Sequence, residues 1–80
     1  MGEAGAILVR QDCGHIHLKL KERLDERHMT RNALARKIGT RFEVIDKWYN
    51  DEVEKIDVDI LVRICFVLDC GVDDILEYIK

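Results

Sequence analysis

The chain contains no proline and no serine, and only five of its 80 residues are glycine. Proline and glycine interrupt regular secondary structure, so their scarcity argues against a loop-rich scaffold and favours helices. No apolar run approaches the ~18 residues needed to cross a membrane. The N-terminal MGEAGAILVR lacks the basic and apolar regions of a signal peptide. We therefore expect a cytoplasmic protein with no membrane partner.

Cysteine is also scarce, and its three residues do not form a CxxC pair. Cys13, Cys65 and Cys70 are odd in number and widely spaced, which argues against a disulfide framework and for a reducing compartment. The sequence contains no glycine-rich phosphate loop, no serine nucleophile and no cysteine–histidine arrangement with a third orienting group. We therefore expect no enzymatic activity, no cofactor and no small-molecule ligand.

Basic residues are outnumbered, with 13 Lys and Arg against 16 Asp and Glu, for a net charge of −3. Their distribution is uneven: residues 27–47 hold six basic and two acidic side chains, whereas residues 51–80 hold three basic and nine acidic ones. A binding partner senses the local patch, because exposed charges are largely screened beyond ~8 Å. The basic window is therefore the expected contact region for a polyanion.

The chain does contain a series of short amphipathic helix patterns, which predict a single all-α domain. Apolar spacing and breaker residues place five helices at about 18–27, 31–38, 41–49, 58–69 and 72–79. N-cap residue types precede three of them: Thr30, Thr40 and Asp57. Thr40 with Glu43 also fits a capping box. Residues suited to ending a helix follow three of them: His28, Gly39 and Gly71.

Residues 6–18 have the pattern of a short β-hairpin, with Ala6–Val9 and His15–Leu18 as its arms. We assign residues 1–17 to an N-terminal extension that carries this hairpin. Cys13, His15 and His17 would share one face of a strand, as a metal site requires. A structural zinc ion needs four ligands, however, and no fourth is nearby, so we expect no metal site.

The second and third predicted helices have the spacing of a helix-turn-helix. A small residue, Ala35, stands where the two helices would approach closely, and Gly39 stands at the bend. Ile45 and Trp48 supply an apolar inner face for the third helix. These four positions together predict two short helices joined by a tight turn.

Over residues 18–80 the chain resembles the small Cro/repressor-like (XRE) helix-turn-helix regulators. The resemblance is carried by KLKERLDERHMT (19–30), ALARKIG (33–39), VIDKWYN (44–50), KIDVDIL (55–61) and LDCGVDDILEY (68–78). It implies a five-helix lambda-repressor-like DNA-binding domain with a recognition helix at about 41–49 in the major groove. It also implies a homodimer on a palindromic double-stranded DNA site.

The resemblance transfers DNA contacts to ten positions: Arg31, Arg36, Lys37, Arg41, Phe42, Glu43, Asp46, Lys47, Asn50 and Lys55. Two of them, Glu43 and Asp46, place carboxylates on a face that would meet a polyanion. Acidic side chains can accept a hydrogen bond from the amino group of cytosine, so they are compatible with binding. They also favour an alternative function, a protein-interaction adaptor or antitoxin-like module that keeps the fold without binding DNA.

The fourth predicted helix carries more apolar surface than one core-facing side requires. Val62, Phe66 and Cys70 form a second apolar line at four-residue spacing. A helix that is apolar nearly all round is buried nearly all round. We therefore expect the N-terminal hairpin or a second subunit to cover this line, with Val62 and Phe66 in a homodimer interface.

Overall fold

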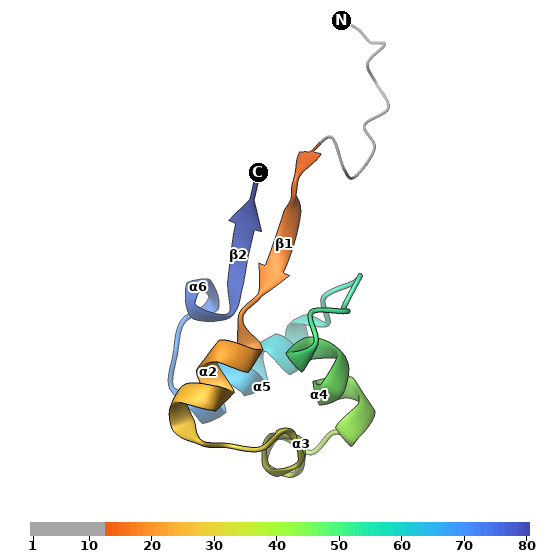
Figure 1. Ribbon diagram of the computed structural model, residues 1–80. Coiled ribbons are helices and arrows are strands. Elements are labelled where there is room, and N and C mark those ends of the chain that lie inside the picture. Colours follow the sequence, from red (N-terminus) through yellow and green to blue (C-terminus); the bar gives the residue numbers. More distant parts are fainter. Residues whose placement is uncertain (1–12) are drawn as a thin grey trace, which may run out of the picture.

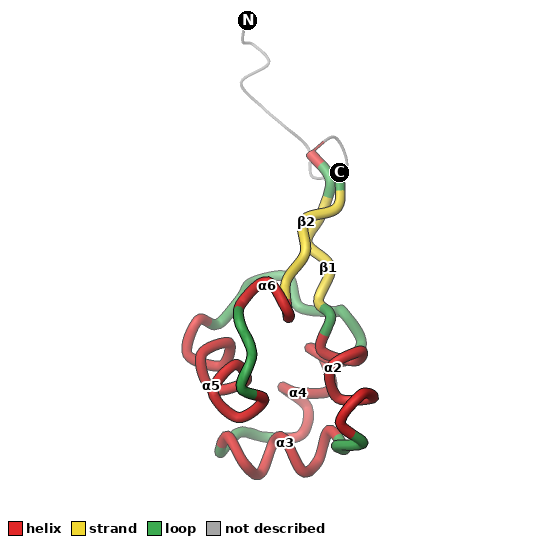
Figure 2. The backbone as a smooth tube through the Cα atoms, turned by 90° about the vertical axis from the view of Figure 1, so that its left-hand side faces the viewer, coloured by secondary structure: helices red, strands yellow, loops and turns green. Residues whose placement is uncertain are grey.

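The computed structural model describes residues 13–80, which form a body of helices with a two-stranded β-ribbon projecting from it (Figure 1). The elements follow the chain as β1 (His15–Leu18), α2 (Leu20–Arg27), α3 (Arg31–Ile38), α4 (Phe42–Tyr49), α5 (Val58–Leu68), α6 (Val72–Ile75) and β2 (Leu76–Ile79). The predicted five-helix fold is confirmed. Viewed from the side, the helices surround the core, and α3 lies at the end opposite the ribbon (Figure 2). In the described residues, no helix is long and apolar enough to span a bilayer.

Local sequence signals explain most of the helix boundaries. The Thr30 hydroxyl accepts a hydrogen bond from the Ala33 amide at 3.0 Å, and the Asp57 carboxylate accepts one from the Asp59 amide at 2.9 Å. Both side chains satisfy amide groups that have no partner inside the helix. His28 ends α2 with φ of 53°, a left-handed conformation that histidine tolerates better than most residues. These three predictions are confirmed.

The core is built entirely from apolar side chains contributed by every helix. Leu20 and Leu24 of α2, Leu34 of α3, Ile45 of α4 and Ile64 of α5 are all fully buried. No polar or charged residue is buried in the described part of the chain. Hydrophobic burial therefore holds the helices together, and charged groups remain at the surface for other roles.

The ribbon joins the two ends of the described chain. Strand β1 pairs with β2 in antiparallel register, with Ile16 opposite Tyr78 and Leu18 opposite Leu76. The predicted strand at His15–Leu18 is thus confirmed, but its partner comes from the C-terminal end. The other predicted hairpin arm, Ala6–Val9, lies outside the described residues.

The predicted fifth helix is too long, because only Val72–Ile75 is helical and Leu76–Ile79 forms a strand. A short apolar segment fits either periodicity. Tertiary contacts decide between helix and strand. Strand β1 offers residues 76–79 backbone hydrogen-bond partners, and Ile75, just before them, is buried in the core.

Three other boundaries also differ from the prediction. The first helix begins at Leu20 because Leu18 belongs to β1, and the third begins after Arg41, with no side-chain cap. The Thr40 amide instead donates to Ala35 at 3.0 Å and completes the end of α3. Helix α5 ends at Leu68 and is followed by Asp69 with φ of 52°, whereas Gly71 precedes α6 in an ordinary extended conformation.

Candidate nucleic-acid interface

Helices α3 and α4 meet through a tight turn centred on Gly39. This glycine has φ of 76°, and its amide donates to Ala35 at 3.0 Å. Ala35 is buried where the helices approach each other, and Ile45 and Trp48 face the core from α4. All four residues occupy the places that the sequence predicted. The turn therefore presents α4 as a short helix packed across α3, with its opposite face in solvent.

The outward face of α4 is polar. Glu43, Lys47 and Asn50 follow one another at helical spacing, and all three are exposed. Asp46 is half-buried beside them, and Phe42 is 39% exposed at the start of the helix. Glu43, Lys47 and Asn50 therefore form an outer line, whereas Phe42 and Asp46 lie on the side of α4 that faces Arg31 of α3.

The basic residues of the 27–47 window take two different roles. Four of them lie exposed within the helix-turn-helix: Arg36, Lys37, Arg41 and Lys47. Arg27, in contrast, donates from Nη2 to the backbone oxygen of Leu68 at 3.0 Å and satisfies the end of α5. Lys55 is exposed in the loop between α4 and α5. Most of the positive charge in the window thus stays free to meet a ligand.

Arg31 is held in a fixed position at the start of α3. Its Nη1 donates to Oδ1 of Asp46 at 2.6 Å. Its guanidinium carbon lies 4.6 Å from the ring centroid of Tyr49 and 5.5 Å from that of Phe42. Cations and aromatic faces attract one another at such distances. Arg31 therefore lies against the side of α4 that carries Phe42, Asp46 and Tyr49.

Further hydrogen bonds extend this cluster across three helices. Asn50 donates from Nδ2 to Oδ1 of Asp46 at 3.2 Å, and the Tyr49 hydroxyl donates to Asp25 of α2 at 3.1 Å. Desolvation of the phenol and the hydrogen bond to Asp25 raise the pKa of Tyr49, so it remains a neutral donor. Sequence reasoning identified Arg31, Asp46 and Asn50 separately but did not detect that Arg31 and Asn50 both contact Asp46.

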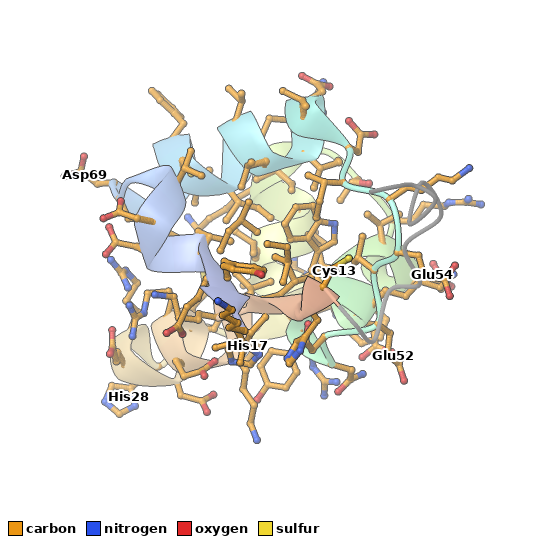
Figure 3. All side chains as sticks on the ribbon, turned by 90° about the horizontal axis from the view of Figure 1, so that it is seen from above. Cys13, His17, His28, Glu52, Glu54 and Asp69 are labelled. Atoms are coloured by element: carbon orange, nitrogen blue, oxygen red, sulfur yellow. The ribbon has the colours of Figure 1, made fainter. Side chains whose placement is uncertain are left out.

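A second polar cluster, which the sequence reasoning missed, lies at the base of the ribbon. His17 contacts Asp51 through Nδ1 at 2.7 Å and Glu22 through Nε2 at 3.1 Å. Asp51 also accepts the Leu18 amide at 3.0 Å. Figure 3 looks down on this region and labels His17 and, to its right, Glu52 of the loop after α4. Asp51 has φ of 59°, a left-handed conformation that glycine adopts most readily.

The His17 ring is therefore engaged by carboxylates rather than arranged with Cys13 and His15. Within residues 13–80, no three His, Cys, Asp or Glu side chains are grouped closely enough to hold a metal ion.

The comparison with protein families matches residues 19–80 to the Cro/C1-type HTH DNA-binding domain. The chain belongs to this family. The family is one of DNA-binding domains. Among solved structures, a candidate DNA-binding protein from Bacteroides fragilis is similar in fold, with a TM-score of 0.70 and 21% sequence identity. The match covers 79% of this chain and 100% of that one. No curated protein sequence matches the chain significantly.

This Cro/C1-type domain also carries an apolar line on the outer side of α5. Val58, Val62 and Phe66 stand four residues apart and are 67%, 58% and 85% exposed. The predicted line through Cys70 was wrong at that end, because α5 stops at Leu68 and Cys70 packs against the core. Val58 extends the line at the other end, and no element of the described chain covers it.

Proposed function

We propose that this Cro/C1-type domain binds specific double-stranded DNA sites as a cytoplasmic transcriptional regulator, in the simplest case a repressor. Helix α4, with Arg41 at its start, would lie in the major groove and read base edges, while basic residues on α3 and in the loop contact phosphates. Occupancy of an operator would then block polymerase. The observation that carries the proposal is the helix-turn-helix of α3 and α4 with its exposed basic residues.

The same proposal includes a homodimer formed through α5. Its support is the apolar line of Val58, Val62 and Phe66, which a second copy would cover with its own identical line. Asp59 and Arg63, ion-paired at 2.9 Å, flank the line on the same helix. Across a two-fold axis, Asp59 of one copy can face Arg63 of the other, and Arg63 can face Asp59, so the same surface is complementary to itself. A two-fold dimer would set two recognition helices about one helical turn, ~34 Å, apart.

Duplex binding measured against salt concentration tests the proposed function. A protein that neutralises phosphates releases counterions, so its affinity for a mixed-sequence duplex should fall steeply between about 50 and 200 mM salt. Lys47→Ala should weaken binding to every duplex and lower the magnitude of the log–log salt slope by ~0.9. Selection of bound duplexes from a random pool would then reveal whether a palindromic site is preferred.

Lys80→Ala is the matched control for Lys47→Ala. It removes the same charge at the C-terminal end of the ribbon, which lies opposite α3 in Figures 1 and 2. Its affinity and slope should equal those of the wild type. Absence of binding to any duplex at low salt would overturn the proposed function and support the adaptor alternative. The exposed carboxylate of Glu43 favours that alternative, because it would repel a polyanion.

A further inference from the structure

Asp46 is one of two carboxylates on the exposed side of α4, and its surroundings differ from those of Glu43. The Asp46 side chain is 34% exposed, and its Oδ1 accepts from both Arg31 and Asn50. Glu43 is exposed on the outer line, and no hydrogen bond to its side chain occurs within the described residues. Asp46 therefore has two partners within the protein, and Glu43 has none among the described residues, although the resemblance places both among the DNA contacts.

Arg31 is restrained on three sides by residues one turn apart on α4. Tyr49 and Phe42 lie against its guanidinium group, and Asp46 accepts one of its N–H groups. A guanidinium group has five N–H donors in a rigid plane. Four donors therefore remain, and the side chain is still 39% exposed. This is the geometry of an arginine that is already oriented before a ligand arrives.

We propose that Asp46 is a positioning residue, which holds Arg31 ready for a DNA phosphate and does not itself read a base. The inference rests on the proposed function, since it needs a bound duplex. A free arginine must be ordered when it binds, and prior ordering removes that cost from the binding step. Guanidinium groups also bind phosphate through parallel N–H bonds, so their orientation matters.

This assignment predicts that removing Asp46 changes the affinity for DNA in the direction opposite to the one expected from charge alone. Removing a carboxylate from a surface that meets a polyanion ordinarily strengthens binding, because like charges repel. Asp46→Ala should instead weaken binding to a mixed-sequence duplex about three- to tenfold, because Arg31 must then be ordered as it binds. Glu43→Ala, the matched control on the same helix, should strengthen binding and leave the slope unchanged.

The double variant Arg31→Ala/Asp46→Ala separates a positioning role from a base contact. Once Arg31 is absent, removal of Asp46 should no longer weaken binding, so the double variant should bind at least as tightly as Arg31→Ala alone. Asp46→Asn keeps an acceptor oxygen and should fall between the wild type and Asp46→Ala. NMR of the free protein gives a readout without DNA: the Arg31 Nε–H should be rigid in the wild type and mobile in Asp46→Ala.

The outcomes distinguish this inference from the proposed function. If the wild type binds no duplex, the proposed function fails and the inference fails with it. If the wild type binds and Asp46→Ala binds more tightly, as is expected of Glu43→Ala, only the inference is overturned. Weakening by Asp46→Ala that persists in the Arg31→Ala background would also overturn it, since Asp46 would then act without Arg31. Asp46→Asn supplies the same comparison if Asp46→Ala does not fold.

Discussion

At the scale of single residues, the bend of the helix-turn-helix depends on the backbone conformation of Gly39. A side chain at this position would meet open space, since no atom lies within 4 Å of the place a Cβ would occupy. Its φ of 76° is nevertheless strained for a β-branched residue. Gly39→Val should lower the free energy of unfolding by about 1–3 kcal/mol. In a domain this small, that loss should lower the melting temperature by several degrees.

Gly39→Asn is the control for this prediction. Asparagine enters the left-handed region more readily than valine, so it should lose much less stability. Circular dichroism during thermal unfolding measures both variants. Equal losses would show that tolerance of the left-handed conformation does not decide which residue the position accepts.

At the scale of elements, the His17 side chain links the ribbon by hydrogen bonds to α2 and to the loop after α4. Hydrogen bonds to Asp51 and then to Glu22 raise the pKa of His17, because both partners are carboxylates that favour the protonated ring. A protonated ring can donate from both nitrogens at once. The stabilising effect is therefore complete below the unfolded value of about 6.5 and is lost as pH rises through the higher folded value. We expect the melting temperature to fall as the pH rises from about 6.5 through the raised pKa of His17 in the folded protein.

Substitution separates this effect from the titration of other groups. His17→Gln should remove the decline of melting temperature across that interval. His15→Gln, on the same strand and with no hydrogen-bond partner among the described residues, should retain it. A decline that survives in His17→Gln would mean that another group controls the pH dependence of stability.

At the scale of the whole molecule, the proposed homodimer depends on the apolar line of α5. Phe66 is 85% exposed in the single chain, and burial of a phenylalanine contributes roughly 1.5–3 kcal/mol. A two-fold interface gains this contribution twice. The wild type should therefore sediment as a dimer at micromolar concentration, and Phe66→Asp should sediment as a monomer. The variant should lose specific DNA binding far more than it loses stability.

Val72→Asp provides the comparison, because Val72 is also an exposed apolar residue, 54% accessible, but lies on α6. It should remain dimeric. A wild type that sediments as a monomer would refute the homodimer. A Phe66→Asp protein that remains dimeric would place the interface elsewhere, and the exposed Ile16 and Tyr78 of the ribbon would be the next residues to test.

The sequence by itself determined the parts of this protein whose causes are local. Thr30 and Asp57 cap helices through amides two or three residues away, and Gly39 adopts its conformation without help from distant residues. Helical spacing likewise places Ile45 and Trp48 in the core. Such signals are complete within a turn or two of chain, so they can be read from the order of residues.

Tertiary structure alone decided the features that join distant segments. Residues 76–79 form a strand because β1, from the other end of the described chain, supplies their hydrogen-bond partners. Asp46 turns to Arg31 because packing of α4 on α3 brings the two side chains within 2.6 Å. Asp51 adopts a glycine-like conformation where the Leu18 amide and His17 reach its carboxylate. Each partner lies far away in sequence, and no local periodicity encodes which distant residue folding will bring into contact.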